Sequence, residues 1–411
     1  MRLNLLATAA LWLTSQARAD DDFSARVAEI LSRPTFADAT VGIKVTDLGC
    51  GNVVYSTGSD APLIPASNQK LLTSTVALAK LGLDFTYDTK IFGSCPISKK
   101  GGRLAAIAAD LSARGLKKIT GKVYADGSVF DSKFLGDGWD PDDEPYYYSA
   151  QVAGLNTDLN VVKVNVAPGT VIGGPPVIKI SGVAEADEKY VKIQSTVKTT
   201  ASGGQESLVF DRVRGTNTII LGGSIPQAAG SVTFTITIDN PNAFTAYRLA
   251  VALNNAGISV SRNPTTPGKK PKGAVELASS TSEPLSALLR LFLKPSDNMY
   301  GEALLKKVGR EADPRKPGSA ATGTPVFANY LEGEGIDTAG VEIVDGSGLS
   351  DLNTVTARFL IDLLVHNKET FTAEEWDAWY NALPIAGVDG TLRAASWAPR
   401  PRAMFMPRRA R

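Results

Sequence analysis

The sequence predicts a mixed α/β catalytic domain that is interrupted by a β-rich insertion. Apolar residues recur at helical spacing in two blocks, one after Pro65 and one from Leu285 onward. Between them, from about residue 161 to 238, β-branched runs are separated by Gly, Pro and Ser turns, which is typical of an all-β segment. Each helical block carries one candidate chemical motif. The β-rich region is therefore interpreted as an insertion into one catalytic domain.

The first block is expected to begin with a β-hairpin. Residues 41–45 and 53–56 alternate around a turn that contains Gly-Cys-Gly. The helix after Pro65 is expected to end near Gly82, because glycine is favoured at helix C-termini. The elements expected next are a strand over 86–92, a helix over 104–114 and a strand over 119–125.

Helical patterns return after the β-rich region, over 243–256, over 285–293 and from Asn298 onward. A further amphipathic pattern over 357–365 leads into His366, the only histidine of the chain, which is expected near the exposed end of that helix. A Ser-His-Asp triad needs a histidine beside the nucleophile, and this setting does not favour one. A serine nucleophile in this chain is therefore expected to use lysine as its base.

Length and charge limit the possible functions. A chain of 411 residues fits two or three domains, and 43% hydrophobic content is enough for sizeable cores. The formal net charge of +1 argues against a general nucleic-acid or acidic-surface binder.

The N-terminus has the pattern of a secretory signal. Arg2 supplies the positive end, residues 3–13 supply the apolar stretch, and Ala17-Arg18-Ala19 has the small-x-small form of a cleavage site. The apolar run is too short to span a bilayer, which argues against a membrane anchor. We therefore expect cleavage near Ala19 and an exported protein, periplasmic or secreted, with no stable membrane span.

The two cysteines, Cys50 and Cys95, leave two alternatives open. In an exported chain they could form one disulfide, and two unpaired thiols are the other possibility. Neither has a second cysteine at metal-ligand spacing, so no zinc site is expected.

The stretch Ser67-Asn68-Gln69-Lys70 is the first candidate for chemistry. Residues three apart on a helix face the same side, so Ser67 and Lys70 are expected within reach of each other. A serine hydroxyl becomes a good nucleophile when a neighbouring base takes its proton, and a lysine with a lowered pKa can be that base. The motif is common by chance, so its value depends on the rest of the chain.

The second candidate is Ser296-Asp297-Asn298, which precedes an apolar helical run. Ser296 or Asp297 would serve well as a helix N-cap, and this capping role is compatible with a catalytic one. S-x-x-K together with S-D-N makes two thirds of a known serine-enzyme set, whose third member is K-T-G.

With these motifs the chain resembles the D-alanyl-D-alanine carboxypeptidases/endopeptidases among the low-molecular-mass penicillin-binding proteins, in the branch with a large insert between the first two motifs. The matching stretches run in family order over residues 64–73, 118–121, 296–298, 345–350 and 383–392. The resemblance implies a penicillin-binding transpeptidase/β-lactamase-like catalytic domain of α/β (α+β) class.

The resemblance also implies the chemistry. Ser67 would attack the carbonyl of the penultimate D-alanine of a peptidoglycan stem peptide, and Lys70 would accept the serine proton. Ser296 would relay a proton to the leaving group, and Asn298 would hold the substrate amide. No metal or other cofactor is required, and β-lactams would acylate Ser67 as substrate mimics. The choice between carboxypeptidase and endopeptidase stays open.

The resemblance sets the expected domain boundaries. We expect a signal peptide (1–19), a discontinuous catalytic domain (20–90 and 285–393), an inserted α/β domain (91–165 and 240–284), a β-rich inserted domain (166–239) and a basic tail (394–411). The chain is short for the family between Ile91 and Leu104, which leaves the edge of the inserted domain open.

The sequence departs from the family in having no K-T-G. Residues 394–411 contain five arginines and no acid. Pro407-Arg408-Arg409-Ala410 can be encoded by bases that read Lys-Thr-Gly in another frame, so we hypothesise a frameshift after about Arg393. The alternative is a genuine basic tail.

The sequence leaves three alternative functions to be tested. The first is an exported D,D-carboxypeptidase/endopeptidase. The second is a catalytically impaired penicillin- or peptidoglycan-binding relic, which the missing K-T-G favours. The third, a β-lactamase, is disfavoured by the large insert between the motifs.

Overall fold

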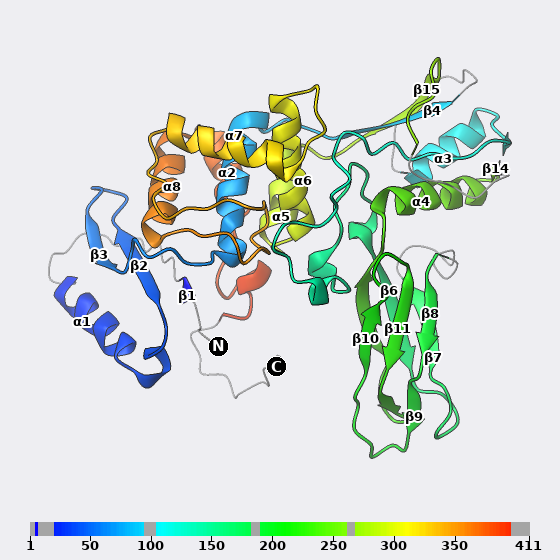
Figure 1. Ribbon diagram of the computed structural model, residues 1–411, viewed down its shortest axis with the longest axis horizontal. Helices are drawn as coiled ribbons and strands as arrows, with labels where there is room; N and C mark the ends of the chain where they lie inside the picture. The colour runs from blue at the N-terminus through cyan, green and yellow to red at the C-terminus, as the bar shows by residue number, and fades with distance from the viewer. Residues whose placement is uncertain (1–4, 7–19, 94–103, 182–189, 261–267, 396–411) are drawn as a thin grey trace.

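A computed structural model describes residues 5–6, 20–93, 104–181, 190–260 and 268–395 of the chain. Three groups of elements are visible in Figure 1. One is a helical lobe that contains α2 and α5 to α8, one is built around α3 and α4, and one is a β-rich lobe that contains β6 to β13. The mixed α/β class expected from the sequence is confirmed.

Within the described residues, the helical lobe contains a small sheet and seven helices. Strands β2 (Val41–Thr46) and β3 (Val53–Thr57) form the expected antiparallel hairpin, and β1 (Leu5–Leu6) pairs in parallel with β2. The helices are α1 (Asp20–Leu31), α2 (Gln69–Leu81), α5 (Leu285–Leu293), α6 (Asn298–Ala312), α7 (Ala320–Gly333), α8 (Ala357–Thr370) and α9 (Ala373–Tyr380).

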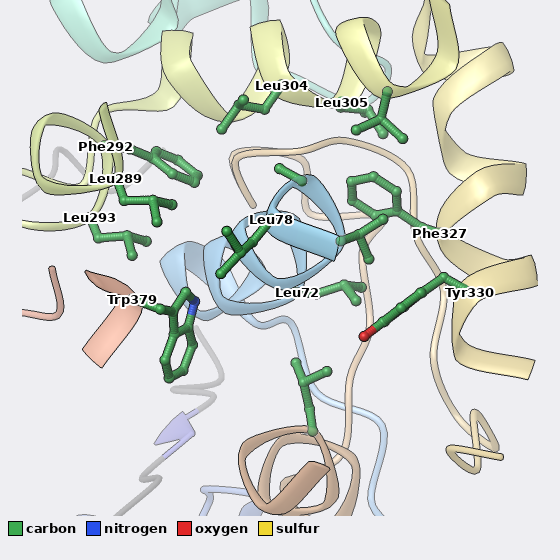
Figure 2. Close-up of a cluster of buried hydrophobic side chains, with 14 of the residues drawn as sticks. Leu72, Leu78, Leu289, Phe292, Leu293, Leu304, Leu305, Phe327, Tyr330 and Trp379 are labelled. Carbon is green, nitrogen blue, oxygen red and sulfur yellow. The ribbon is translucent and has the colours of Figure 1, made fainter. Parts of the chain in front are cut away.

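Helix α2 lies in the centre of this lobe. Leu72 and Leu78 of α2 are buried in one apolar cluster with side chains of α5, α6, α7 and α9, as Figure 2 shows. Two buried polar side chains of α2 have partners on other helices: Trp379 donates to Ser74 at 2.8 Å and Asn367 donates to Thr75 at 2.7 Å. A helix enclosed on this many sides gives a rigid support to the residues at its N-terminus.

The second lobe is a small α/β unit. Strands β4 (Asp88–Gly93) and β15 (Val275–Thr281) pair antiparallel beside α3 (Leu104–Ala113) and α4 (Pro241–Asn255). Strands β5 (Lys118–Ile119) and β14 (Ser259–Val260) pair in parallel. The strand expected over 119–125 is wrong in extent, because β5 ends at Ile119 and the chain bends at Gly121.

The β-rich lobe contains eight strands among the described residues. They are β6 (Val161–Ala167), β7 (Val177–Ser181), β8 (Lys192–Ser195), β9 (Lys198–Thr200), β10 (Val209–Arg212), β11 (Thr218–Gly222), β12 (Ser224–Pro226) and β13 (Val232–Thr237). They pair in the orders β13-β6-β7, β10-β11-β8 and β12-β9. Alternate residues of β6 and β11 point into one shared core, which confirms the all-β interpretation of this region.

Each lobe has its own apolar core. This observation supports the proposed division of the chain, which stays a prediction. Strand β6 crosses the boundary expected at residue 166, since its first residues already belong to the β-rich core. We therefore propose to move that boundary to the start of β6.

Several sequence expectations fall outside the described residues. They concern the signal segment at 1–4 and 7–19, Cys95, and the tail from 396 to 411. Cys50 is exposed in the turn between β2 and β3. None of the helices in the described ranges has the length and apolar character needed to cross a membrane.

Candidate active site

Ser67 lies at the point where the chain enters α2. A short 3-10 helix, Ala66–Asn68, carries Ser67 and leads directly into α2, which places Ser67 at an exposed position and Lys70 at a buried one. Lys70 Nζ donates to Ser67 Oγ at 3.2 Å. The expected approach of these two side chains is confirmed by this distance.

Ser296 faces Ser67 from the other side. Its Oγ donates to Ser67 Oγ at 2.8 Å. Asp297, and not Ser296, is the N-cap of α6, because the Asp297 carboxylate accepts from Tyr300 N–H at 3.2 Å. Ser296 has φ of 58°, a conformation that is costly for a residue other than glycine and that recurs at functional sites. The capping role and the contact with Ser67 are thus divided between neighbours.

Asn298 contacts Lys70 from the first turn of α6. Its Oδ1 accepts from Lys70 Nζ at 2.6 Å, and its Nδ2 donates to the Tyr148 carbonyl at 2.7 Å. The structure therefore brings together all four residues singled out in the sequence, Ser67, Lys70, Ser296 and Asn298.

A third acceptor for Lys70 comes from the glycine-rich turn at 345–350. The carbonyl of Ser347 accepts from Lys70 Nζ at 2.7 Å. Gly348 in this turn has φ of 80°, and a Cβ there would collide with the carbonyl of Ala66 beside Ser67. The positive φ and the close approach together explain why glycine is needed at this position.

Glu302 supports the same turn and was missed by the sequence analysis. It is buried on α6, and its Oε1 accepts from Gly346 N–H at 3.0 Å and from Ser347 N–H at 2.9 Å. Burial, and then the charge of Asp345, raise the pKa of Glu302 to about 8. Its position one turn into α6 after Asn298 was the only available signal.

Burial also lowers the pKa of Lys70 to about 8, although the nearby carboxylates Glu302, Asp345 and Asp297 oppose this shift. A lysine with this pKa is present in its neutral form in an appreciable fraction near neutral pH. It can therefore accept a proton from the hydroxyl that it contacts.

His366 lies elsewhere in the helical lobe. Its ring contacts the Tyr330 hydroxyl at 3.0 Å and the Thr370 hydroxyl at 3.3 Å. His366 lies near the exposed end of α8, as expected, but its side chain is only 11% exposed because the imidazole packs against Tyr330. Within the described ranges, no group of three or more His, Cys, Asp or Glu side chains is arranged to hold a metal ion.

The mixed α/β fold and the contact between Ser67 and Lys70 are those expected of a serine enzyme with a lysine base. The sequence profile of the D-Ala-D-Ala carboxypeptidase 3 (S13) family matches residues 23–401, and the chain belongs to this family. The family resemblance drawn from the sequence is thereby confirmed.

Individual relatives agree with the family match. The chain is 36% identical over 393 residues to the D-alanyl-D-alanine carboxypeptidase of Actinomadura sp. (strain R39), covering 88% of this chain and 71% of the relative. It is 25% identical over 398 residues to the D-alanyl-D-alanine carboxypeptidase DacB of Haemophilus influenzae, covering 88% and 80%.

A solved structure has the same fold. The crystal structure of penicillin binding protein 4 (dacB) from Haemophilus influenzae matches with a TM-score of 0.71 and 24% identity, over 85% of this chain and 79% of that one. A second crystal structure of that protein, complexed with a β-lactam, matches with a TM-score of 0.67 and 22% identity, over 85% and 78%.

Proposed function

We propose that this chain is a serine D-Ala-D-Ala carboxypeptidase/endopeptidase that acts on peptidoglycan stem peptides through an acyl-enzyme on Ser67. The observation that carries the proposal is the position of Ser67 Oγ, which is 3.2 Å from Lys70 Nζ and 2.8 Å from Ser296 Oγ. A hydroxyl with a lysine of lowered pKa on one side and a second hydroxyl on the other has both a proton acceptor and a proton relay.

The reaction divides into acylation and deacylation. Ser67 Oγ attacks the carbonyl carbon of the penultimate D-alanine while its proton passes to neutral Lys70. The peptide bond breaks, the proton that Lys70 has taken passes through Ser296 to the amine of the leaving terminal D-alanine, and the peptide stays as an ester on Ser67. Water then attacks the ester, which releases the shortened peptide and restores the hydroxyl of Ser67.

Asn298 is proposed to serve both the lysine and the substrate. Its Oδ1 accepts from Lys70 Nζ, which also contacts Ser67 Oγ, and its amide is proposed to hold a substrate amide. β-Lactams contain an amide that resembles the scissile bond, so they are expected to acylate Ser67. The crystal structure of the Haemophilus influenzae relative with a β-lactam is in line with this expectation.

The site of action follows from the substrate. Stem peptides lie outside the cytoplasmic membrane, so the enzyme is proposed to be exported, with a signal peptide that is cleaved near Ala19. Export is tested by expressing the full gene and sequencing the N-terminus of the protein recovered outside the cytoplasm.

Labelling with a fluorescent penicillin tests the proposed mechanism. The wild type is expected to carry a stable label on Ser67, identified by peptide mass spectrometry, and to release D-alanine from a pentapeptide. Ser67→Ala is expected to do neither while keeping its melting temperature. An unlabelled, folded wild type would favour the catalytically impaired alternative, and a label that turns over quickly would favour a β-lactamase.

A further inference from the structure

Residues 144–149, here called the connecting segment, contact both the β-rich lobe and the candidate active site. At one end the Tyr148 carbonyl accepts a hydrogen bond of 2.7 Å from Asn298. At the other end Glu144 is buried against the β-rich lobe. The connecting segment is therefore a direct structural link between an inserted lobe and a residue that touches Lys70.

The Glu144 end is held by a buried ion pair. Glu144 Oε1 lies 2.6 Å from Nη2 of Arg212, whose side chain is 1% exposed. Thr237 Oγ1 donates to the Glu144 carbonyl at 2.5 Å and accepts from Arg212 Nε at 3.3 Å. Arg212 ends β10 and Thr237 ends β13, so two strands of the β-rich lobe close around one residue. The short, charge-assisted bond between Arg212 and Glu144 fixes both distance and direction.

The middle of the connecting segment is held by the same lobe. Tyr146 forms an antiparallel bridge with Ile236, and its ring lies 5.0 Å from the ring of Phe210. The rings of Tyr146 and Tyr148 stack at 5.6 Å. The position of the Tyr148 backbone is thus fixed by contacts that run back to Glu144.

The Tyr148 carbonyl decides which way the Asn298 amide points. A carbonyl only accepts hydrogen bonds, so the NH₂ group of Asn298 must face it. The amide oxygen then faces Lys70, and it accepts from Nζ at 2.6 Å. An Asn298 amide turned the other way would present donors to a lysine, which removes one of the acceptors that hold Lys70.

We propose that Glu144 and Arg212 are positioning residues, through which the β-rich lobe fixes the Tyr148 carbonyl and thereby the orientation of Asn298. On this proposal the β-rich lobe is a part of the catalytic apparatus, although among the described residues the side-chain hydrogen bonds of Ser67 come from Lys70 and Ser296. The inference rests on the proposed roles of Ser67, Lys70 and Asn298.

A double-mutant cycle in the full chain tests the inference, with fluorescent penicillin as the probe and the second-order acylation rate as the readout. Glu144→Gln is expected to slow acylation about tenfold, the usual effect of one misplaced hydrogen bond to a charged group. In an Asn298→Ala background the same change is expected to have less than about a twofold effect, because the residue through which it acts is gone. The pH midpoint of acylation is expected to fall in Glu144→Gln, because the ammonium form of Lys70 loses an acceptor.

Matched variants separate positioning from general damage. Arg214→Met removes an exposed charge 3.8 Å from Glu144 and is expected to leave the rate unchanged. Thr237→Val removes only the hydroxyl that bonds the Glu144 carbonyl, and it is expected to reproduce the slower acylation if Glu144→Gln fails to fold. Equal losses in both backgrounds, or full activity in folded Glu144→Gln and Thr237→Val, would overturn the inference. Failure of the proposed function gives a different result. In that case the wild type carries no penicillin label on Ser67, and its labelling equals that of Ser67→Ala.

Discussion

Replacing Glu302 by glutamine is expected to remove a large pH dependence of stability. Glu302 is buried, and its pKa is raised from 4.5 to about 8 by burial and by Asp345. Between these two values the folded protein binds the proton more tightly than the unfolded chain does. Stability is therefore highest below pH 4.5 and falls as the pH rises through about 8. Integration over pH 5 to 8 gives a loss of roughly 3 to 4 kcal/mol from this one group.

Glutamine does not ionise, and its amide oxygen can still accept from Gly346 and Ser347 N–H. Urea unfolding followed by tryptophan fluorescence at pH 5 and pH 8 measures the difference, with equal m-values as the check that the same transition is observed. Glu302→Gln is expected to lose roughly 3 to 4 kcal/mol less than the wild type between these pH values. The exposed Glu332→Gln is the control and should follow the wild type. An unchanged pH slope in Glu302→Gln would refute the reasoning.

Two further predictions concern the base and the core. Acylation by penicillin is expected to accelerate as the pH rises through about 8, because the pKa of Lys70 is lowered to about that value and only its neutral form accepts the Ser67 proton. Stopped-flow labelling from pH 6 to 9 measures the rate, and a flat profile would argue against the lysine base. Phe292→Ala is expected to lower the free energy of unfolding in urea by about 3 to 5 kcal/mol, because Phe292 is completely buried in the core shown in Figure 2. Leu291 is half exposed on the same helix, so Leu291→Ala should cost far less. Similar losses in the two variants would show that the core is not organised as described.

The sequence predicted the residues that touch Ser67, because their identity and spacing carry the signal. Ser67 and Lys70 lie one turn apart, so helix geometry alone brings them together. Ser296 and Asn298 lie at the start of α6, and the Ser-Asp-Asn motif predicts the contacts that they make with Ser67 and Lys70.

What the sequence did not predict depends on contacts between distant parts of the chain. The Tyr148 carbonyl accepts from Asn298, and the Ser347 carbonyl accepts from Lys70. Every residue has a backbone carbonyl, so residue types do not show which carbonyls will lie at the site. Glu302 resembles any helical glutamate until its burial is known. The strand expected over 119–125 was wrong in extent because β propensity does not fix where a strand ends, and the chain bends at Gly121.

The contacts around α6 suggest why an insertion is compatible with a demanding active site. Lys306 Nζ lies 2.7 Å from Asp131 Oδ1, and Trp139 Nε1 donates to Asp345 at 2.9 Å. Both Asp131 and Trp139 belong to the chain that leads toward the connecting segment, so this stretch is bound first to α6 and then to the 345–350 turn. The inserted chain thus contacts α6 and the 345–350 turn, which both hold Lys70, before it enters the β-rich lobe. We therefore expect a displacement of that lobe to disturb the turn that holds Lys70 as well as Asn298, and so to slow acylation.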